Sequence, residues 1–263
     1  MPGLVIDEGG RWPLGRFPEL AAAPRVVHAV TTRDGPVFGT VGTTADTATA
    51  SGELAAELGL EGAAWARQVH GGKVLRVDRP GPAGEADALV TEVPGLLLIG
   101  RSADCPLVLV GGRRPGGDPV VGFAHASWRA TVAGITARMV ACLCDDLGAD
   151  PASLRAAIAP SAGPCCYEVG AEVRAQATTA LGAEAGRFFV PGPVADRPVG
   201  EAREHFDLWA ANTDQLVRSG VASTAIERSD RCTICHGERF WSWRVQGEAA
   251  GRFAAAIGIV HRR

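Results

Sequence analysis

The chain has 263 residues, of which 46% are hydrophobic and 21% are charged, and its formal net charge at pH 7 is −3. This balance is typical of a globular protein with enough apolar material for a core, and it does not favour binding to nucleic acid or to an anionic membrane. No apolar run reaches the roughly 18–20 residues of a membrane span and no secretory pattern opens the chain, so we expect a cytoplasmic protein.

The seven cysteines are an odd number, which does not indicate a disulfide framework in a chain without an export pattern. We expect most of them to be small buried residues. Cys142 and Cys144 fall on a predicted helix as packing or surface residues, and Cys165 and Cys166 are expected to pack in a Gly-Pro turn rather than to bind a metal. The stretch "CTICH" (232–236) matches the haem-attachment pattern, but an apolar strand follows it, so we interpret the match as accidental.

The N-terminal half is predicted to consist mainly of strands. It begins with a strand at 25–33 and, after a turn, an Ala/Leu/Glu helix within 44–60. The remaining elements follow from alternation and Gly/Pro turns: two strands within 65–77 joined through His70-Gly71-Gly72, strands at 86–91 and within 95–110, a hairpin loop at 111–119 and its return strand at 120–127.

The C-terminal half mixes helices and strands. The pattern predicts a helix at 128–148 closed by Gly148, a strand at 154–160, a helix at 167–181, a loop at 191–200, a helix at 205–220, strands at 223–229 and 239–245, and a helix at 247–258. Several strands run consecutively without a βαβ rhythm, and neither a GxGxxG nor a P-loop pattern is present. We therefore predict an α+β fold, with one domain over residues 1–263 and helices outside a mixed sheet.

Three residues with metal-binding side chains lie at the ends of predicted strands: His70 in "RQVHGG", Cys105 in "SADCPL" and His125 in "GFAHASWR". A strand end holds a side chain rigidly while one side stays open to a ligand. Three protein ligands and a vacant position are the usual composition of a catalytic zinc site. Spacing alone is a weak signal, and the same residues could be core packing or a cysteine–histidine nucleophilic pair.

A set of motifs carries more information. "RQVHG", "EADALVT", "SADCPLVLV", "GFAHASWRATVAGI", "APSAGPCCYEVG", "HFDLWAAN" and "CTICHGERFWSWR" resemble, in order, the signatures of the YfiH-type laccase-domain family, from about residue 26 to 260. The resemblance implies an α/β/β/α sandwich and a zinc ion, or alternatively copper, held by His70, Cys105 and His125. It also implies phosphorolysis of adenosine, inosine and methylthioadenosine together with adenosine deamination; other names in the family are polyphenol oxidase and peptidoglycan editing factor.

The chemistry of deamination and phosphorolysis suggests roles for the metal and for further residues. A catalytic metal with an open position lowers the pKa of bound water to about 7, and zinc deaminases attack adenine at C6 in this way. Phosphorolysis needs a basic pocket, for which we predict Arg33, Gln68 and Arg129, the last beside a helix N-terminus. Gln68 should share a face with His70 if that segment is extended. The expected partners are a purine nucleoside and phosphate; the oligomeric state is left open.

Three alternatives stay open. Six histidines without a His-x-His pair are too few for a multicopper oxidase, although a His₂Cys set could hold a single copper with Met139 as a remote axial candidate. Cys105 could instead be the nucleophile of a hydrolase acting on cell-wall precursors. The third alternative is a binding protein without turnover.

Some residues have ambiguous roles or depart from the family pattern. Asp104 could orient a ligand or shuttle a proton, or only bond backbone amides. The family's usual Gly-Trp-Arg-Gly is Ser-Trp-Arg-Ala at 127–130, the segment 39–51 is altered, and Arg101 stands where an apolar residue is expected. These departures leave the preferred substrate in doubt more than the metal.

Overall fold

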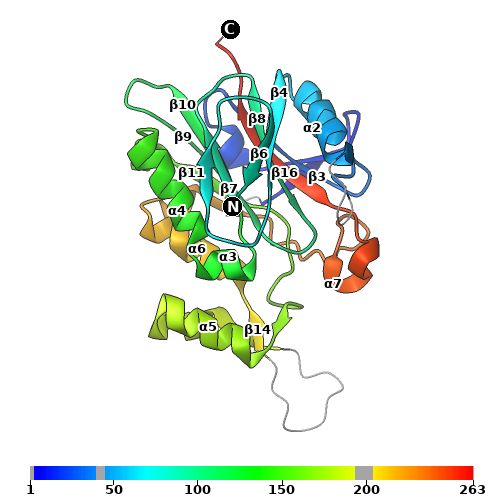
Figure 1. Ribbon diagram of the computed structural model, residues 1–263, viewed down its shortest axis with the longest axis vertical. Coiled ribbons are helices and arrows are strands. Elements are labelled where there is room, and N and C mark those ends of the chain that lie inside the picture. Colours follow the sequence, from blue (N-terminus) through cyan, green and yellow to red (C-terminus); the bar gives the residue numbers. More distant parts are fainter. Residues whose placement is uncertain (1–2, 40–44, 193–203, 263) are drawn as a thin grey trace.

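The computed structural model describes residues 3–39, 45–192 and 204–262. Within these ranges, two large β-sheets lie face to face and helices cover their outer sides (Figure 1). Helix α2 (Ala45–Glu57) covers one sheet, and α4 (Ile135–Ala141) with α6 (Leu208–Arg218) covers the other. This arrangement confirms the expected α/β/β/α sandwich. None of the described helices has the length and apolar character needed to cross a membrane.

The first sheet has seven strands in the described residues. Their order is β1 (Val5–Asp7), β2 (Leu14–Arg16), β3 (Val26–Thr31), β16 (Phe253–Ile259), β8 (Leu96–Ser102), β4 (Gly62–Arg67) and β6 (Gly81–Glu85). Strand β4 pairs with β8 and β6 in parallel, whereas β16 is antiparallel to both β3 and β8. The sheet is therefore mixed, as predicted.

The second sheet has six strands over the same ranges. Their order is β15 (Ile226–Arg228), β11 (Arg155–Ile158), β9 (Leu107–Arg113), β10 (Pro119–His125), β7 (Ala88–Thr91) and β5 (Val74–Arg76). The predicted hairpin is confirmed, because β9 and β10 pair antiparallel from Leu107↔His125 to Arg113↔Pro119. The two strands predicted within 65–77 do not pair with each other, since β4 and β5 belong to different sheets.

The main core fills the space between the two sheets. Leu98 and Phe253 of the first sheet and Leu109 and Phe123 of the second are fully buried there. Gly100 permits this close packing, because a Cβ at that position would lie 2.7 Å from a ring carbon of Phe123. Burying one such aromatic or aliphatic side chain contributes about 1.5–3 kcal/mol.

A smaller lobe lies beneath the sandwich (Figure 1). It has its own apolar cluster and consists of α5 (Ala171–Leu181) and a three-stranded sheet of β12 (Glu168–Val169), β14 (Glu204–Phe206) and β13 (Phe189–Pro191). Other short elements are α1 (Pro18–Ala21), α3 (Trp128–Val132), α7 (Trp243–Gln246), a π-helical turn (Cys142–Asp146) and 3-10 turns at Pro151–Ser153, Ala183–Phe188, Ser223–Ala225 and Gly247–Ala249.

Two predictions near the C-terminus are wrong. The segment 247–258 is not a helix, because its second half is β16, whose seven residues are all buried and which runs through the middle of the first sheet. Burial on both faces outweighs the helix propensity of its alanines. The segment 239–245 is not a strand but a turn leading into α7.

The predicted helix at 128–148 is interrupted. Gly134 has φ +76° and separates α3 from α4, and the last turn is π-helical. Gly148, with φ +71°, ends the segment as predicted. The predicted loop at 191–200 and the turn before α2 lie largely outside the described residues.

Candidate metal centre

His70, Cys105 and His125 come together where the chain crosses between the two sheets. His70 lies on the connection from β4 to β5, and Cys105 lies on the connection from β8 to β9. Both connections leave the first sheet and enter the second. His125 is the last residue of β10 in the second sheet. The crossings therefore bring together residues that are up to 55 positions apart in the sequence.

The three side chains form a compact group of metal donors. One ligand atom from each residue lies within 4.8 Å of the other two. The imidazole rings of His70 and His125 are 5.0 Å apart between centroids and meet edge-on at 73°. His125 is only 3% exposed, whereas His70 is exposed and Cys105 is half-buried. The group is thus anchored in the core on one side and reaches the surface on the other.

Asp87, at the start of β7, holds both histidines in place. Its carboxylate accepts hydrogen bonds from three successive backbone N–H groups at distances of 3.2, 2.9 and 2.7 Å, those of Val69, His70 and Gly71. His70 has φ +59°, a left-handed conformation that lets successive N–H groups converge on one anion. The same carboxylate lies 2.8 Å from His125 Nδ1.

Asp87 was missed as a site residue by the sequence prediction. Its side chain is fully buried, and the bond to Nδ1 leaves Nε2 of His125 as the atom available to a metal. The only sequence signal was an acid at the start of the apolar strand in "EADALVT". A charged residue at such a place has to be paired, which makes it a functional candidate.

The turn that carries Cys105 is fixed from several sides. Ser102 Oγ donates to the Cys105 carbonyl (2.6 Å). Asp104 has φ +96°, and its carboxylate accepts hydrogen bonds from Thr233 Oγ1 and from the Arg244 backbone N–H, both at 2.6 Å. Asp104 thereby positions the loop. Of the two roles considered for Asp104, ligand or proton handling and bonding of backbone amides, these contacts match the second.

The metal-free cluster is electrostatically polarised. Burial opposes ionisation of Cys105, but the charge of His125 and hydrogen bonds from both histidines lower its pKa to about 6. Burial also opposes protonation of His125, but Cys105 and Asp87 raise its pKa to about 9. The pKa of Asp87 lies below its ordinary value, because the bonds from His125 and the backbone outweigh its burial. Both shifts favour a thiolate at Cys105 and an imidazolium at His125 when no metal is bound.

Two arginines add positive charge next to Cys105. Burial, and then the charge of Arg252, lower the pKa of Arg101. The pKa of Arg252 is lowered by burial as well, although the charges of Cys105 and Asp104 act in the opposite direction. The Arg101 Nε is buried without a hydrogen-bond partner. The other two guanidinium nitrogens of Arg101 donate to Thr47 Oγ1 (2.7 Å) and to the Ala66 carbonyl (3.4 Å).

The residues predicted to bind substrate have other contacts. Gln68 exchanges two hydrogen bonds with the backbone of Arg101 (2.8 and 2.9 Å). Because His70 is left-handed, the segment is not extended, so the condition under which Gln68 was expected to share a face with His70 is not met. Arg33 stacks on Trp241 at 4.1 Å and donates to a backbone carbonyl. Arg129 is exposed and stacks on Trp128 within a five-residue helix, too short for the predicted anion-binding N-terminus. Substrate binding by these three residues stays a prediction.

The donor set fits a zinc ion. One thiolate and two imidazoles leave a fourth tetrahedral position free, as in catalytic zinc sites. The bond from His125 to a buried carboxylate is the outer support that zinc-binding histidines usually have. Of the six histidines, all within the described part of the chain, only His70 and His125 enter a cluster able to hold a metal. The described residues therefore lack the histidine ligands that the four copper ions of a multicopper oxidase require.

Comparison with known proteins adds independent information. A family model described as "Multi-copper polyphenol oxidoreductase laccase" matches residues 40–260. A purine nucleoside phosphorylase from Deinococcus radiodurans is 38% identical over an alignment of 266 residues that covers 95% of this chain and 94% of the relative. The adenosine deaminase RL5 from an unknown prokaryotic organism is 34% identical over 187 residues, 70% of this chain and 67% of the relative. The crystal structure of the Bacillus licheniformis protein YfiH superposes with a TM-score of 0.82 at 25% identity and covers 97% of this chain and 98% of that one.

Proposed function

Since the chain belongs to the multi-copper polyphenol oxidoreductase laccase family, we propose that it is a zinc-dependent enzyme that phosphorolyses purine nucleosides and deaminates adenosine. The observation that carries the proposal is the group of His70, Cys105 and His125, with Asp87 behind His125. The names of the relatives support the substrate class. When bound, the metal supplies Lewis acidity at a position open to small molecules.

Phosphorolysis requires an anion beside the nucleoside. A phosphate oxygen forms a bond to C1′ of the ribose while the bond from C1′ to the purine breaks. We assign the phosphate to the neighbourhood of Arg101 and Arg252, because two mutually repelling guanidinium groups are stabilised by an anion. Arg33, Gln68 and Arg129 remain candidates for the outer part of the same pocket.

The departing purine carries the electron pair of the broken bond and needs a proton or a hydrogen-bond donor. Tyr167 can meet the second need, since burial and the charge of Cys105 raise the pKa of its hydroxyl, which therefore keeps its proton and donates a hydrogen bond rather than the proton itself. The ring of Tyr167 lies under the guanidinium of Arg244 at 5.3 Å, which restricts its orientation. Tyr167 therefore serves as the donor to the leaving base.

The other functions considered receive less support. The cysteine hydrolase would use the thiolate–imidazolium pair of the metal-free cluster, but the relatives named here are a phosphorylase and a deaminase. A zinc-bound thiolate is also masked as a nucleophile. A single-copper polyphenol oxidase would use the same three residues as the proposed zinc enzyme. The identity of the bound metal and the reaction products distinguish these two functions.

The experiment is a product analysis on zinc-loaded protein. Adenosine or inosine is incubated with and without phosphate, and bases, nucleosides and ribose 1-phosphate are separated by chromatography. The proposal predicts phosphate-dependent release of the base and, from adenosine without phosphate, formation of inosine. Removal of the metal with a chelator should abolish both, and added zinc should restore them.

A variant tests the phosphate assignment. Arg252→Ala should raise the KM for phosphate more than tenfold and leave phosphate-independent deamination within about threefold of wild type. Arg218→Ala, at an exposed arginine on α6, is the matched control. Zinc-replete protein that consumes no purine nucleoside, or base release that does not depend on phosphate, would contradict the proposal.

A further inference from the structure

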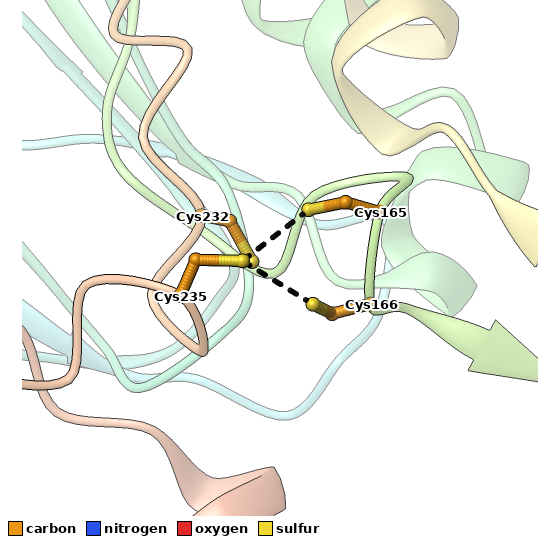
Figure 2. A group of neighbouring side chains, drawn as sticks. All are labelled: Cys165, Cys166, Cys232 and Cys235. Atoms are coloured by element: carbon orange, nitrogen blue, oxygen red, sulfur yellow. Dashed lines mark hydrogen bonds between the residues drawn. The ribbon is translucent and has the colours of Figure 1, made fainter. Parts of the chain in front are cut away.

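A second group of metal donors lies outside the site described above. It consists of four cysteines from two loops, Cys165 and Cys166 before β12, and Cys232 and Cys235 after β15. All four sulfur atoms lie within 4.8 Å of one another. Figure 2 shows the four side chains pointing toward a common centre from opposite sides. The sequence prediction, which treated the first pair as turn packing and the "CTICH" match as accidental, did not place these cysteines together.

The sulfur positions suit a single tetrahedral ion. Zinc–sulfur bonds of about 2.3 Å at tetrahedral angles imply sulfur–sulfur distances of about 3.8 Å. Cys235 Sγ lies 3.7 Å from Cys165 Sγ and 3.4 Å from Cys166 Sγ. These distances exceed the roughly 2.05 Å of a disulfide bond, and all four residues are free cysteines. The spacing is close to that of a mononuclear thiolate site.

The backbone around the cluster also favours a thiolate. Cys232 is 3% exposed, and its sulfur accepts the N–H of Gly163 at 3.3 Å. Ser161 and Cys232 form an isolated parallel bridge, so the two loops are already paired at the base of the cluster. Cys165 and Cys235 are exposed, which gives an ion a path of entry. Hydrogen bonds from the backbone to sulfur are a common outer support of metal thiolates.

We propose that Cys165, Cys166, Cys232 and Cys235 form a second metal site, which binds one zinc ion with four thiolates. Four protein ligands leave no open position, which is the composition of a structural zinc site rather than a catalytic one. The ion would tie together two loops that are separated by more than sixty residues in the sequence. Binding would release protons, because burial raises the pKa values of Cys165 and Cys166 and a metal binds the thiolate form.

The two loops are in direct contact with the turn that carries Cys105. The Ala162 backbone N–H donates to the Asp104 carbonyl (2.8 Å), and Thr233 Oγ1 donates to the Asp104 carboxylate. Tyr167 follows Cys166 directly, and its backbone N–H donates to the Gly163 carbonyl (2.8 Å). An ion at the four cysteines would therefore stiffen the supports of Cys105 and Tyr167 without touching substrate.

Metal counting tests this site separately from the proposed function. Wild-type protein, purified under reducing conditions and equilibrated with zinc, should contain about two zinc ions per chain, and Cys232→Ser/Cys235→Ser about one. Cys142→Ser/Cys144→Ser, at two half-buried cysteines outside both clusters, is the matched control and should keep both ions. His70→Ala should lose the other ion only. The count at the four cysteines therefore stays informative even if the His70 site proves empty or the enzyme inactive.

A spectroscopic readout identifies the ligands. Cobalt-substituted His70→Ala protein should show the intense visible bands of tetrahedral thiolate coordination, which Cys165→Ser weakens. Cys165 is exposed, so this variant should fold even if the Cys232/Cys235 double variant does not. The proposal is overturned if zinc-equilibrated Cys232→Ser/Cys235→Ser binds as much zinc as wild type, if zinc-equilibrated His70→Ala binds no zinc, or if peptide mapping finds these cysteines disulfide-bonded in metal-free native protein.

Discussion

Replacing Asp87 by asparagine should disable the candidate metal centre without removing any metal ligand. The carboxylate accepts four hydrogen bonds, and each oxygen takes two of them: Oδ1 from His70 N–H and His125 Nδ1, and Oδ2 from Val69 N–H and Gly71 N–H. An asparagine side chain offers one oxygen and one NH₂ group. In either orientation its NH₂ group therefore faces two donors.

The two orientations fail in different ways. With the NH₂ group toward Val69 and Gly71, two partly buried N–H groups lose their acceptor, at up to about 1 kcal/mol each. With the NH₂ group toward His125, the imidazole has to accept at Nδ1 and carry its proton on Nε2, which removes the lone pair that would bind the metal. Loss of the outer partner of a metal-binding histidine typically weakens metal affinity about 10–100-fold.

The assay is a competition for zinc against a chromogenic chelator, with circular dichroism to establish that the variant is folded. We expect Asp87→Asn to bind zinc at least tenfold more weakly than wild type, and to lose nucleoside turnover in proportion at limiting zinc. Glu227→Gln is the matched control, since Glu227 is a buried carboxylate that accepts the Leu20 N–H far from the site. A folded Asp87→Asn protein with wild-type zinc affinity would refute the assigned role of Asp87.

Three further predictions concern ionisation and packing. Burial and the charge of Arg16 lower the pKa of His28 to about 3. In the unfolded chain this histidine is protonated more readily. The stability that neutral His28 contributes is therefore present above pH 6.5 and is lost as the pH falls toward 3. The unfolding free energy of His28→Gln should therefore fall less steeply than that of wild type between pH 6 and 4, by up to about 1.4 kcal/mol per pH unit in urea titrations, and parallel curves would contradict the assignment. In metal-free protein, alkylation of Cys105 followed by peptide mapping should rise with pH around a midpoint near 6, as its lowered pKa requires, whereas a midpoint above 8 with no protection by zinc would argue against the histidine contacts. Asn212→Ala should cost about 2–4 kcal/mol with zinc affinity unchanged, because fully buried Asn212 links Thr131 to Thr136 across α3, α4 and α6; an unchanged melting temperature would show that these bonds contribute little.

The motifs picked out the three residues that the structure brings together as possible metal donors, but not the residue that supports them. His70, Cys105 and His125 were recognisable because each stands at a strand end with a side chain that binds metals. Asp87 acts through three backbone N–H groups and one imidazole, and this geometry exists only once the His70 segment adopts a left-handed turn. The same turn removes the extended backbone on which the expected common face of Gln68 and His70 depended.

Long-range packing explains most of the other differences. The alanines of 254–256 favour a helix locally, yet they form part of a central strand because Ala254 and Ala256 pack toward α2 and Ala255 packs toward the second sheet. The four clustered cysteines looked unrelated, because their two pairs are 66 positions apart and no local pattern links them. The parallel pairing of β11 with β15, continued by the bridge between Ser161 and Cys232, brings the two loops together.

The most direct test of the central claim is to measure bound zinc and inosine phosphorolysis on the same samples of wild type, Cys105→Ala and the control Cys144→Ala. The account predicts that Cys105→Ala folds, loses the zinc ion of the His70 site and forms no ribose 1-phosphate, while Cys144→Ala matches wild type in both quantities. A Cys105→Ala protein that still phosphorolyses inosine would contradict the claim that the group of His70, Cys105 and His125 carries the reaction.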